Sequence, residues 1–378
     1  MPQLDIRRKY THGYKKKKKQ KSDNFFVGVL SGIFPWKDDT GAELSRKLVF
    51  LTSMVALIVS VTLLIDFYFG GSEITAEPDY WSVNNDETGM AVVEIPPQSG
   101  NPSDAPIQIE ILAKYKELWE KNKEMVGYVS VDPYINYPVV QPSVDKPYDF
   151  YLHHDFYGEP AVNGTVFVTS DVKHSPPTLL NTGRPDNIIL HGHYGVSRNI
   201  FQPLTNYRDS FTFLQNHPVI TFDTLYEPGR YRIFAVYQTN TEEHHGEYYD
   251  YWNKNNFSTA DDFYEYVLDA LDRSRYHTDV ELRYGDELLT LSTCDPSMLS
   301  EIRLVVVARR ERLNESEPMD VDSFVSLRTD GGKINGLMKY KMFDAFYKAR
   351  NSGRGWAGRQ WDTARVEGLD EYLLRMEQ

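Results

Sequence analysis

A lone cysteine and an arginine shortly after it are the residues best suited to covalent chemistry. Cys294 is the only cysteine among the 378 residues, and Arg303 lies nine positions later. A thiolate attacks carbonyl carbon readily, but it requires a nearby base or cation and donors for the oxyanion that forms. If residues 287–292 and 303–309 form adjacent antiparallel strands, Cys294 and Arg303 face each other at one end of a sheet. A small buried hydrophobe is the alternative role for a free cysteine.

The segments around these two residues carry a family pattern. Thr290-Leu-Ser-Thr-Cys294 is followed by Arg303-Leu-Val-Val-Val-Ala-Arg309. This pair of segments resembles the signature of sortases, the cysteine transpeptidases of Gram-positive cell envelopes, and within them it is most similar to class B. The resemblance covers about residues 109–310. It disfavours a papain-type protease, in which the cysteine precedes the histidine.

The resemblance implies a histidine as the second catalytic group. The segment Asn187-Ile-Ile-Leu-His-Gly-His193 is similar to the sortase Gly-His element, which selects His193 among ten histidines. His191 shares a strand face with His193, so which imidazole lies closer to the thiol stays open. In the implied mechanism Cys294 attacks a Thr carbonyl of a sorting signal and Arg303 stabilises the oxyanion. His193 protonates the leaving amine and then activates the incoming one.

Further residues are expected to line the substrate groove. His153 lies where sortases often carry Asn, although a surface histidine is an equal alternative. The expected substrate-binding residues are Leu152, His153, Tyr194, Ser292, Thr293 and Asp295, and a solvated carboxylate is the alternative for Asp295. We expect no metal and no cofactor, because adjacent histidines on a strand point to opposite faces and no His-Glu-x-x-His or Cys-x-x-Cys pattern occurs.

Charge and hydropathy predict a membrane anchor. Residues 1–47 contain 12 Lys or Arg against 5 Asp or Glu, whereas the whole chain has a net charge of −13. Residues 48–65 form an uncharged stretch of 18 residues, long enough to cross a hydrocarbon core of ~30 Å. The basic residues place the N-terminus in the cytoplasm and the acidic remainder outside. A cleaved signal peptide is the disfavoured alternative, because the apolar run is long and begins late.

Eight strand-like runs separated by Gly, Pro, Asn and Asp turns predict a mainly β fold, a closed antiparallel barrel. They are residues 127–131, 135–141, 164–169, 187–191, 219–223, 231–238, 287–292 and 303–309. The resemblance identifies this fold as the eight-stranded sortase β-barrel. Helical spacing also predicts an N-terminal helix within residues 107–125 and a helix from about residue 258, before the cysteine-bearing strand. Asp132-Pro133-Tyr134 resembles the lid tripeptide of class C sortases, but its position between two strands predicts a turn.

The predicted organisation follows from these elements. It comprises a basic cytoplasmic N-terminus (1–47), a transmembrane signal anchor (48–69), an extracytoplasmic stalk (70–107), a class B sortase-like catalytic domain (108–312) and a C-terminal extension (313–378). Helical spacing of Leu337, Tyr340, Phe343, Phe346 and Tyr347 predicts that the extension is partly helical.

The expected function is that of a sortase transpeptidase. It would cleave a C-terminal sorting signal of secreted proteins through a thioester on the cysteine, and transfer the acyl group to an amine of the cell wall. A pilin-polymerising sortase that uses a pilin lysine is the first alternative, and an inactive sortase-like binding module is the second. No nucleic-acid partner is expected, because no nucleic-acid motif accompanies the lysine run at 15–19.

Overall fold

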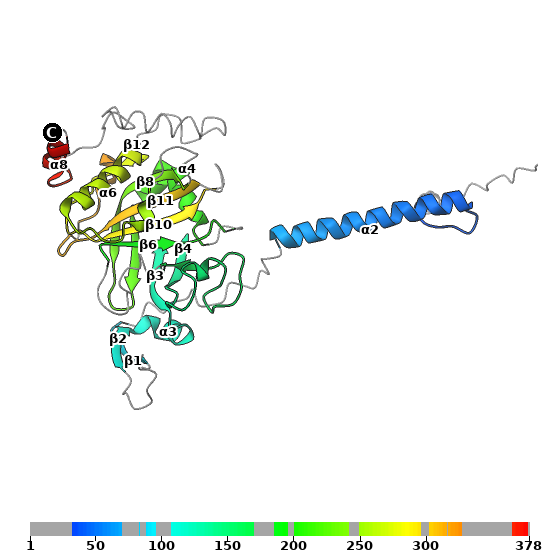
Figure 1. Ribbon diagram of the computed structural model, residues 1–378, viewed down its shortest axis with the longest axis horizontal. Helices are drawn as coiled ribbons and strands as arrows, with labels where there is room; N and C mark the ends of the chain where they lie inside the picture. Colours follow the sequence, from blue (N-terminus) through cyan, green and yellow to red (C-terminus); the bar gives the residue numbers. More distant parts are fainter. Residues whose placement is uncertain are drawn as a thin grey trace, which may run out of the picture. The chain divides into compact units, whose positions relative to one another are not determined.

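The computed structural model (Figure 1) describes residues 32–69, 83, 88–95, 107–169, 185–195, 200–241, 249–295, 302–315, 317–326 and 365–376. The chain divides into two compact units, Met1–Ser72 and Glu73–Gln378. One long helix belongs to the first unit, and every strand described below belongs to the second.

The first unit contains a long apolar helix, α2 (Gly41–Phe69). A capping box begins it, because the Thr40 hydroxyl accepts from the Glu43 amide at 3.4 Å and the Glu43 carboxylate accepts from the Thr40 amide at 3.0 Å. The segment Gly41–Thr62 is long and apolar enough to cross a membrane, and only 6% of its most apolar window is buried. A core helix of a soluble domain would be mostly buried, so α2 is a candidate membrane span, and it includes all of residues 48–69, the expected anchor.

The second unit is built around a closed barrel with the strand order β10-β11-β8-β7-β3-β4-β5-β6. All eight expected strands are present, which confirms the barrel. Their bounds are β3 (Met125–Val131), β4 (Ile135–Val140), β5 (Val166–Phe167), β6 (Asn187–His191), β7 (Val219–Thr224), β8 (Arg230–Asn240), β10 (Leu288–Cys294) and β11 (Ile302–Arg310).

The expectation of a purely antiparallel barrel is wrong at two places. Strand β4 pairs with β5, and β10 with β6, in parallel. Parallel neighbours require a long connection between them, and residues 141–165 supply one between β4 and β5. Asp132-Pro133-Tyr134 forms the turn between β3 and β4, as expected, with a cis peptide bond before Pro133.

Helix α6 (Ala260–Arg273) packs against β8, as Figure 1 shows. A capping box begins this helix: the Thr259 hydroxyl accepts from the Asp262 amide at 3.2 Å, and the Asp262 carboxylate accepts from the Thr259 amide at 2.9 Å. The apolar face carrying Phe263 and Val267 is fully buried. The helix expected before the cysteine-bearing strand is therefore confirmed.

The N-terminal part of the barrel domain differs from the expectation. Residues 107–112 are not helical: they form β2 (Ile107–Leu112), which pairs antiparallel with β1 (Met90–Ile95). Isoleucines at positions 107, 109 and 111 repeat with the period of two that a strand requires, and β-branched residues favour that conformation. The helix is shorter than expected, with η2 (Ala113–Tyr115) and α3 (Lys116–Lys121). Strand β1 also lies inside the expected stalk, whose other residues lie mostly outside the described ones.

Short elements complete the barrel domain. They are η3 (Phe150–Leu152), η4 (Gln202–Leu204), α4 (Thr205–Asp209), α5 (Phe211–Asn216), η6 (Tyr251–Asn253), β9 (Tyr276–His277), η7 (Val321–Ser323), β12 (Val325–Ser326) and α8 (Leu369–Met376).

The described parts of the C-terminal extension pack on the barrel domain. Strand β12 pairs with β9, and helix α8 lies against α6, where the Tyr372 and Tyr264 rings are 5.7 Å apart. Leu369 at the start of α8 is fully buried. The helical spacing noted at residues 337–347 lies outside the described residues.

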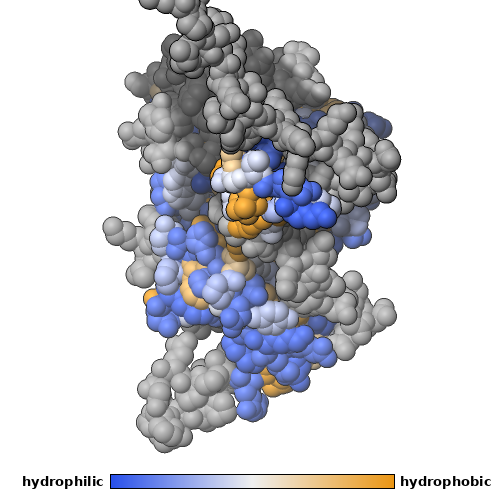
Figure 2. Space-filling view, turned by 90° about the vertical axis from the view of Figure 1, so that its right-hand side faces the viewer, coloured by the Kyte–Doolittle hydropathy of each residue, from blue (hydrophilic) through white to orange (hydrophobic). Residues whose placement is uncertain are grey.

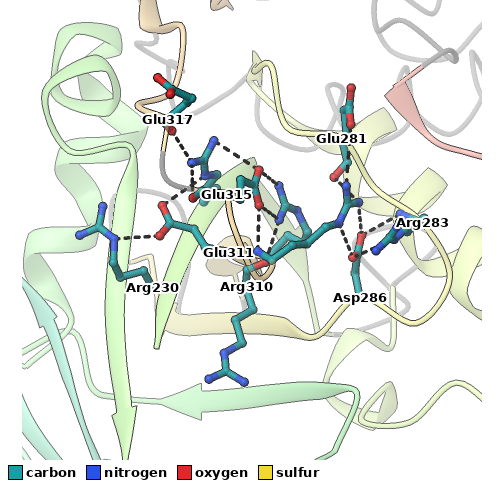
Figure 3. A network of polar contacts seen from close by, with 11 residues as sticks. Arg230, Glu281, Arg283, Asp286, Arg310, Glu311, Glu315 and Glu317 are labelled. Atoms are coloured by element: carbon teal, nitrogen blue, oxygen red, sulfur yellow. Dashed lines mark hydrogen bonds and ion pairs between the residues drawn. The ribbon is translucent and has the colours of Figure 1, made fainter. Parts of the chain in front are cut away.

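A network of arginines and carboxylates covers the end of the β10–β11 pair that lies farthest from Cys294 (Figure 3). The guanidinium of buried Arg309 donates to both oxygens of Glu315, at 2.5 and 2.7 Å. These bonds lower the pKa of Glu315 to about 2. Arg312 pairs with Asp286 at 2.9 Å in the same network. The network therefore fixes the segment after β11 to the barrel, remote from the cysteine.

On the face shown in Figure 2, the described residues are mostly hydrophilic, and the apolar ones form small separate areas. This is the ordinary pattern of a water-exposed protein surface.

Candidate active site

The pairing of β10 with β11 brings the expected nucleophile to the expected cation. Cys294, the last residue of β10, pairs with Arg303, the second residue of β11. Just beyond this pair, the Asp295 amide donates to the Ile302 carbonyl at 2.8 Å and closes the ladder. The residues before Cys294 are buried, whereas Cys294 is partly exposed. The thiol therefore lies where the strand pair reaches the surface.

The parallel pairing of β6 with β10 brings the histidines to the same end. His191, the last residue of β6, pairs with Ser292, and the Gly192 amide donates to the Ser292 carbonyl at 3.2 Å. A Cβ atom on Gly192 would lie 2.7 Å from the Phe201 ring, so only glycine permits this close approach. His193 follows directly. The pairing of β6 with β10 and the close approach at Gly192 therefore place His193 just past the end of β6.

These residues surround a cavity of about 580 Å³, which we call the Cys294 cavity. Stretches that lie far apart in the sequence contribute to it. Its lining residues are Tyr148, Asp149, Leu152, Phe167, Thr169, His191, Gly192, His193, Thr241, Tyr251, Trp252, Asn253, Ser292, Thr293, Cys294 and Arg303.

The environment of His193 favours its neutral form. Desolvation, and then the neighbouring His153 and Arg303, lower the pKa of His193, while a hydrogen bond to the Leu152 carbonyl opposes this shift. The His153 and His193 ring centroids are 5.9 Å apart. Nε2 of His193 is buried and has no hydrogen-bond partner among the residues that the structure describes. This nitrogen is thus available for proton transfer with a bound substrate.

His191 lines the same cavity but differs in its surroundings. Its ring packs against Phe167 with the centroids 5.5 Å apart. Desolvation and the nearby Arg303 guanidinium lower the pKa of His191 to about 4. The imidazole of His191 is therefore neutral at physiological pH.

The expected substrate-binding residues divide into two groups. Leu152, Ser292 and Thr293 line the Cys294 cavity. His153 is exposed beside His193, and Tyr194 lies outside the lining, where its hydroxyl accepts from Gln202 Nε2 at 3.4 Å.

Asp295 lies elsewhere than expected, being neither solvated nor part of the cavity lining. Its side chain is fully buried, forms an ion pair with Arg208 of α4 and accepts from Gln238 Nε2 of β8 at 2.6 Å. Gln238 in turn accepts from Arg275 at 3.1 Å. The chain turns inward after β10, so this carboxylate anchors the segment that follows the nucleophile.

Several lining residues were not expected from the sequence. The Tyr251 hydroxyl is hydrogen-bonded to Ser292 Oγ at 2.6 Å, and desolvation raises the pKa of Tyr251 to about 12 against the opposing effect of that bond. Trp252 and Asn253 follow it in η6. The aromatic run at residues 248–252 is the signal that could have identified this wall.

Comparisons with known proteins identify the family of this chain. A family model described as "Sortase domain" matches residues 167–311, which include His193, Cys294 and Arg303. The chain is 31% identical to sortase B of Listeria monocytogenes over 187 residues, covering 49% of this chain and 69% of the relative. It is 27% identical to sortase B of Staphylococcus aureus over 204 residues, covering 53% of this chain and 76% of the relative.

Solved structures of sortase B also match. The B. anthracis sortase B in complex with AAEK1 is 30% identical, with a TM-score of 0.43, and the match covers 53% of this chain and 85% of that one. The S. aureus sortase B–substrate complex is 26% identical, with a TM-score of 0.44, and the match covers 54% of this chain and 87% of that one. The Clostridium perfringens sortase B is 28% identical, with a TM-score of 0.44, and the match covers 52% of this chain and 98% of that one.

Proposed function

Because the chain belongs to the sortase family of cysteine transpeptidases, we propose that it cleaves a C-terminal sorting signal of a secreted protein and joins the new carboxyl end to an amine of the cell wall. The observation that carries this proposal is the pairing of Cys294 with Arg303 beside His193 in one cavity. The signal anchor, with the N-terminus in the cytoplasm and the barrel domain outside, belongs to the same proposal.

In the first step, the Cys294 thiolate attacks the carbonyl carbon of the scissile peptide bond. The C–S bond forms while the carbonyl oxygen becomes an oxyanion, which the Arg303 guanidinium stabilises. His193, as the imidazolium, gives its proton to the departing amine as the C–N bond breaks. The product is a thioester on Cys294.

In the second step, an amine attacks the thioester. The new C–N bond forms, the amine proton passes to His193, and the C–S bond breaks to regenerate the thiolate. The unpaired Nε2 of His193, which has no partner among the described residues, supports this role. Desolvation and the neighbouring His153 and Arg303 lower the pKa of His193, so the imidazolium form that the first step requires is disfavoured until a substrate is bound.

The test is a transpeptidation assay with the full-length chain in detergent. The enzyme is mixed with a pool of Leu-Pro-x-Thr-Gly-like and Asn-Pro-x-Thr-like peptides and glycinamide, and products are identified by mass. A peptide whose carboxyl end has been joined to glycinamide is the expected product, and the Cys294→Ala and His193→Ala variants should not form it. His217→Ala removes a histidine remote from the Cys294 cavity and should retain activity. Product formation by Cys294→Ala would overturn the proposal.

A further inference from the structure

The second step poses an electrostatic difficulty in the Cys294 cavity. An acceptor amine arrives in water as an ammonium ion, and the Arg303 guanidinium that the oxyanion requires repels it. Among the described residues that line the cavity, Asp149 is the only carboxylate, and the basic or titratable nitrogens belong to His191, His193 and Arg303. We propose that Asp149 forms the subsite that receives the acceptor's ammonium group. This inference rests on the proposed transpeptidation.

The position of Asp149 suits this role. It is the residue before η3 (Phe150–Leu152), and its carbonyl accepts from the Leu152 amide at 2.8 Å. The Leu152 carbonyl in turn accepts a hydrogen bond from the His193 ring. At a rise of about 2 Å per residue, the 3₁₀ turn separates the backbones of Asp149 and Leu152 by about 6 Å. Asp149 and the residue whose carbonyl holds the His193 ring therefore belong to one short turn at the edge of the Cys294 cavity.

Within the described part of the chain, the Asp149 carboxylate has no structural task. It makes no hydrogen bond and no ion pair with the residues that the structure describes, and an aspartate that precedes a helix ordinarily caps it, which this side chain does not do. Nearby acidic side chains, in contrast, have hydrogen-bond partners. Glu124 accepts from Lys146 at 2.8 Å, and Asp155 accepts from the Tyr157 and Glu159 amides at 2.8 and 2.9 Å. None of the described residues engages the Asp149 carboxylate, so it is available to a ligand.

Two aromatic residues of the cavity lining suit the same ligand class. Tyr148 and Trp252 also line the cavity, and aromatic rings attract ammonium groups. The chemistry selects a primary ammonium on a flexible chain, such as the amino end of a short peptide or a lysine side chain. It disfavours an acceptor with a negative charge beside the amine.

The test separates the two half-reactions. The full-length chain in detergent is acylated with a peptide that it accepts, and the thioester partitions between water and an added nucleophile. One nucleophile is glycylglycinamide, which is cationic at neutral pH, and the other is hydroxylamine, which is neutral. The variant is Asp149→Asn. The matched control is Asp145→Asn, an exposed aspartate of the same loop that does not line the cavity.

Asp149→Asn should lower the ratio of aminolysis to hydrolysis for glycylglycinamide about 3- to 10-fold, the effect of one partly solvated charge pair. The hydroxylamine ratio should fall much less than the glycylglycinamide ratio, and Asp145→Asn should behave as the unaltered chain. An unchanged glycylglycinamide ratio, or an equal fall for hydroxylamine, would overturn the Asp149 subsite alone. Absence of any thioester in the unaltered chain would overturn the proposed function and the subsite with it.

Discussion

Replacing Asp295 with Asn tests how the segment after the nucleophile is held. The fully buried Asp295 carboxylate pairs with Arg208, and the Arg208 side chain is only 12% exposed. The substitution keeps the shape of the side chain but removes its charge. It leaves the Arg208 guanidinium with its other carboxylate partner, Asp209, which is 55% exposed. The same arginine therefore has one buried and one solvated ion pair that can be compared.

The magnitude follows from this difference in burial. Removing one partner of a buried ion pair costs about 3–5 kcal/mol. The amide that Asp295→Asn introduces can still bond to Gln238, so we expect a loss of about 2–4 kcal/mol in the free energy of unfolding. That corresponds to a fall in Tm of about 5–15 °C for a domain of this size. Asp209→Asn should cost only about 0.5 kcal/mol, because its side chain is solvated.

The assay is thermal unfolding of the full-length chain in detergent, followed by near-ultraviolet circular dichroism, together with steady-state turnover. Because Asp295 fixes the residue next to Cys294, Asp295→Asn should also lower kcat about 10-fold or more with little change in the KM for peptide. Equal Tm values for Asp295→Asn and Asp209→Asn would show that the buried Asp295–Arg208 pair does not stabilise the fold. An unchanged kcat of Asp295→Asn below its Tm would refute the positioning role of Asp295.

Two further predictions concern stability. The pKa of His191 is about 4 in the folded chain, against an ordinary value of 6.5 that applies to the unfolded chain. As the pH falls, the unfolded state therefore binds the proton first. The free energy of unfolding decreases from pH 6.5 towards pH 4 for this reason. Between pH 7 and pH 5, the Tm of His191→Phe should therefore fall less than the Tm of the unaltered chain. Identical profiles of Tm against pH would contradict this. In α8, Leu369→Ala should lower the free energy of unfolding by about 2–5 kcal/mol because Leu369 is fully buried. Leu374→Ala should leave it almost unchanged because Leu374 is 62% exposed. Equal losses in the two variants would show that α8 does not pack on the domain.

The barrel could be predicted because its strands have a strong local signal. Runs rich in β-branched residues separated by turn residues specify strands, and all eight appear in the structure. The direction in which neighbours pair depends on contacts between distant parts of the chain, which is why the parallel pairs of β4 with β5 and β10 with β6 were not predicted. Residues 107–112 satisfy a helical and an alternating pattern at once, and pairing with β1 decides the outcome.

The central residues of the site could be predicted from motifs, whereas their surroundings could not. The motifs predicted that His193, Cys294 and Arg303 act together, and all three line the Cys294 cavity. Whether a neighbouring side chain faces the cavity depends on packing: Asp295 turns inward to Arg208, which is 87 positions away in the chain. Asp149 enters the lining only because of the tertiary fold.

The central claim is that the thiol of Cys294 carries the acyl group between the two steps. The most direct measurement is intact mass of the full-length chain after acid quenching of a reaction with the peptide pool and no amine. We expect a mass increase equal to the acyl part of one peptide, located on Cys294 after digestion and removed by glycinamide. An unmodified chain under conditions in which peptide is cleaved, or an adduct on another residue, would contradict the account.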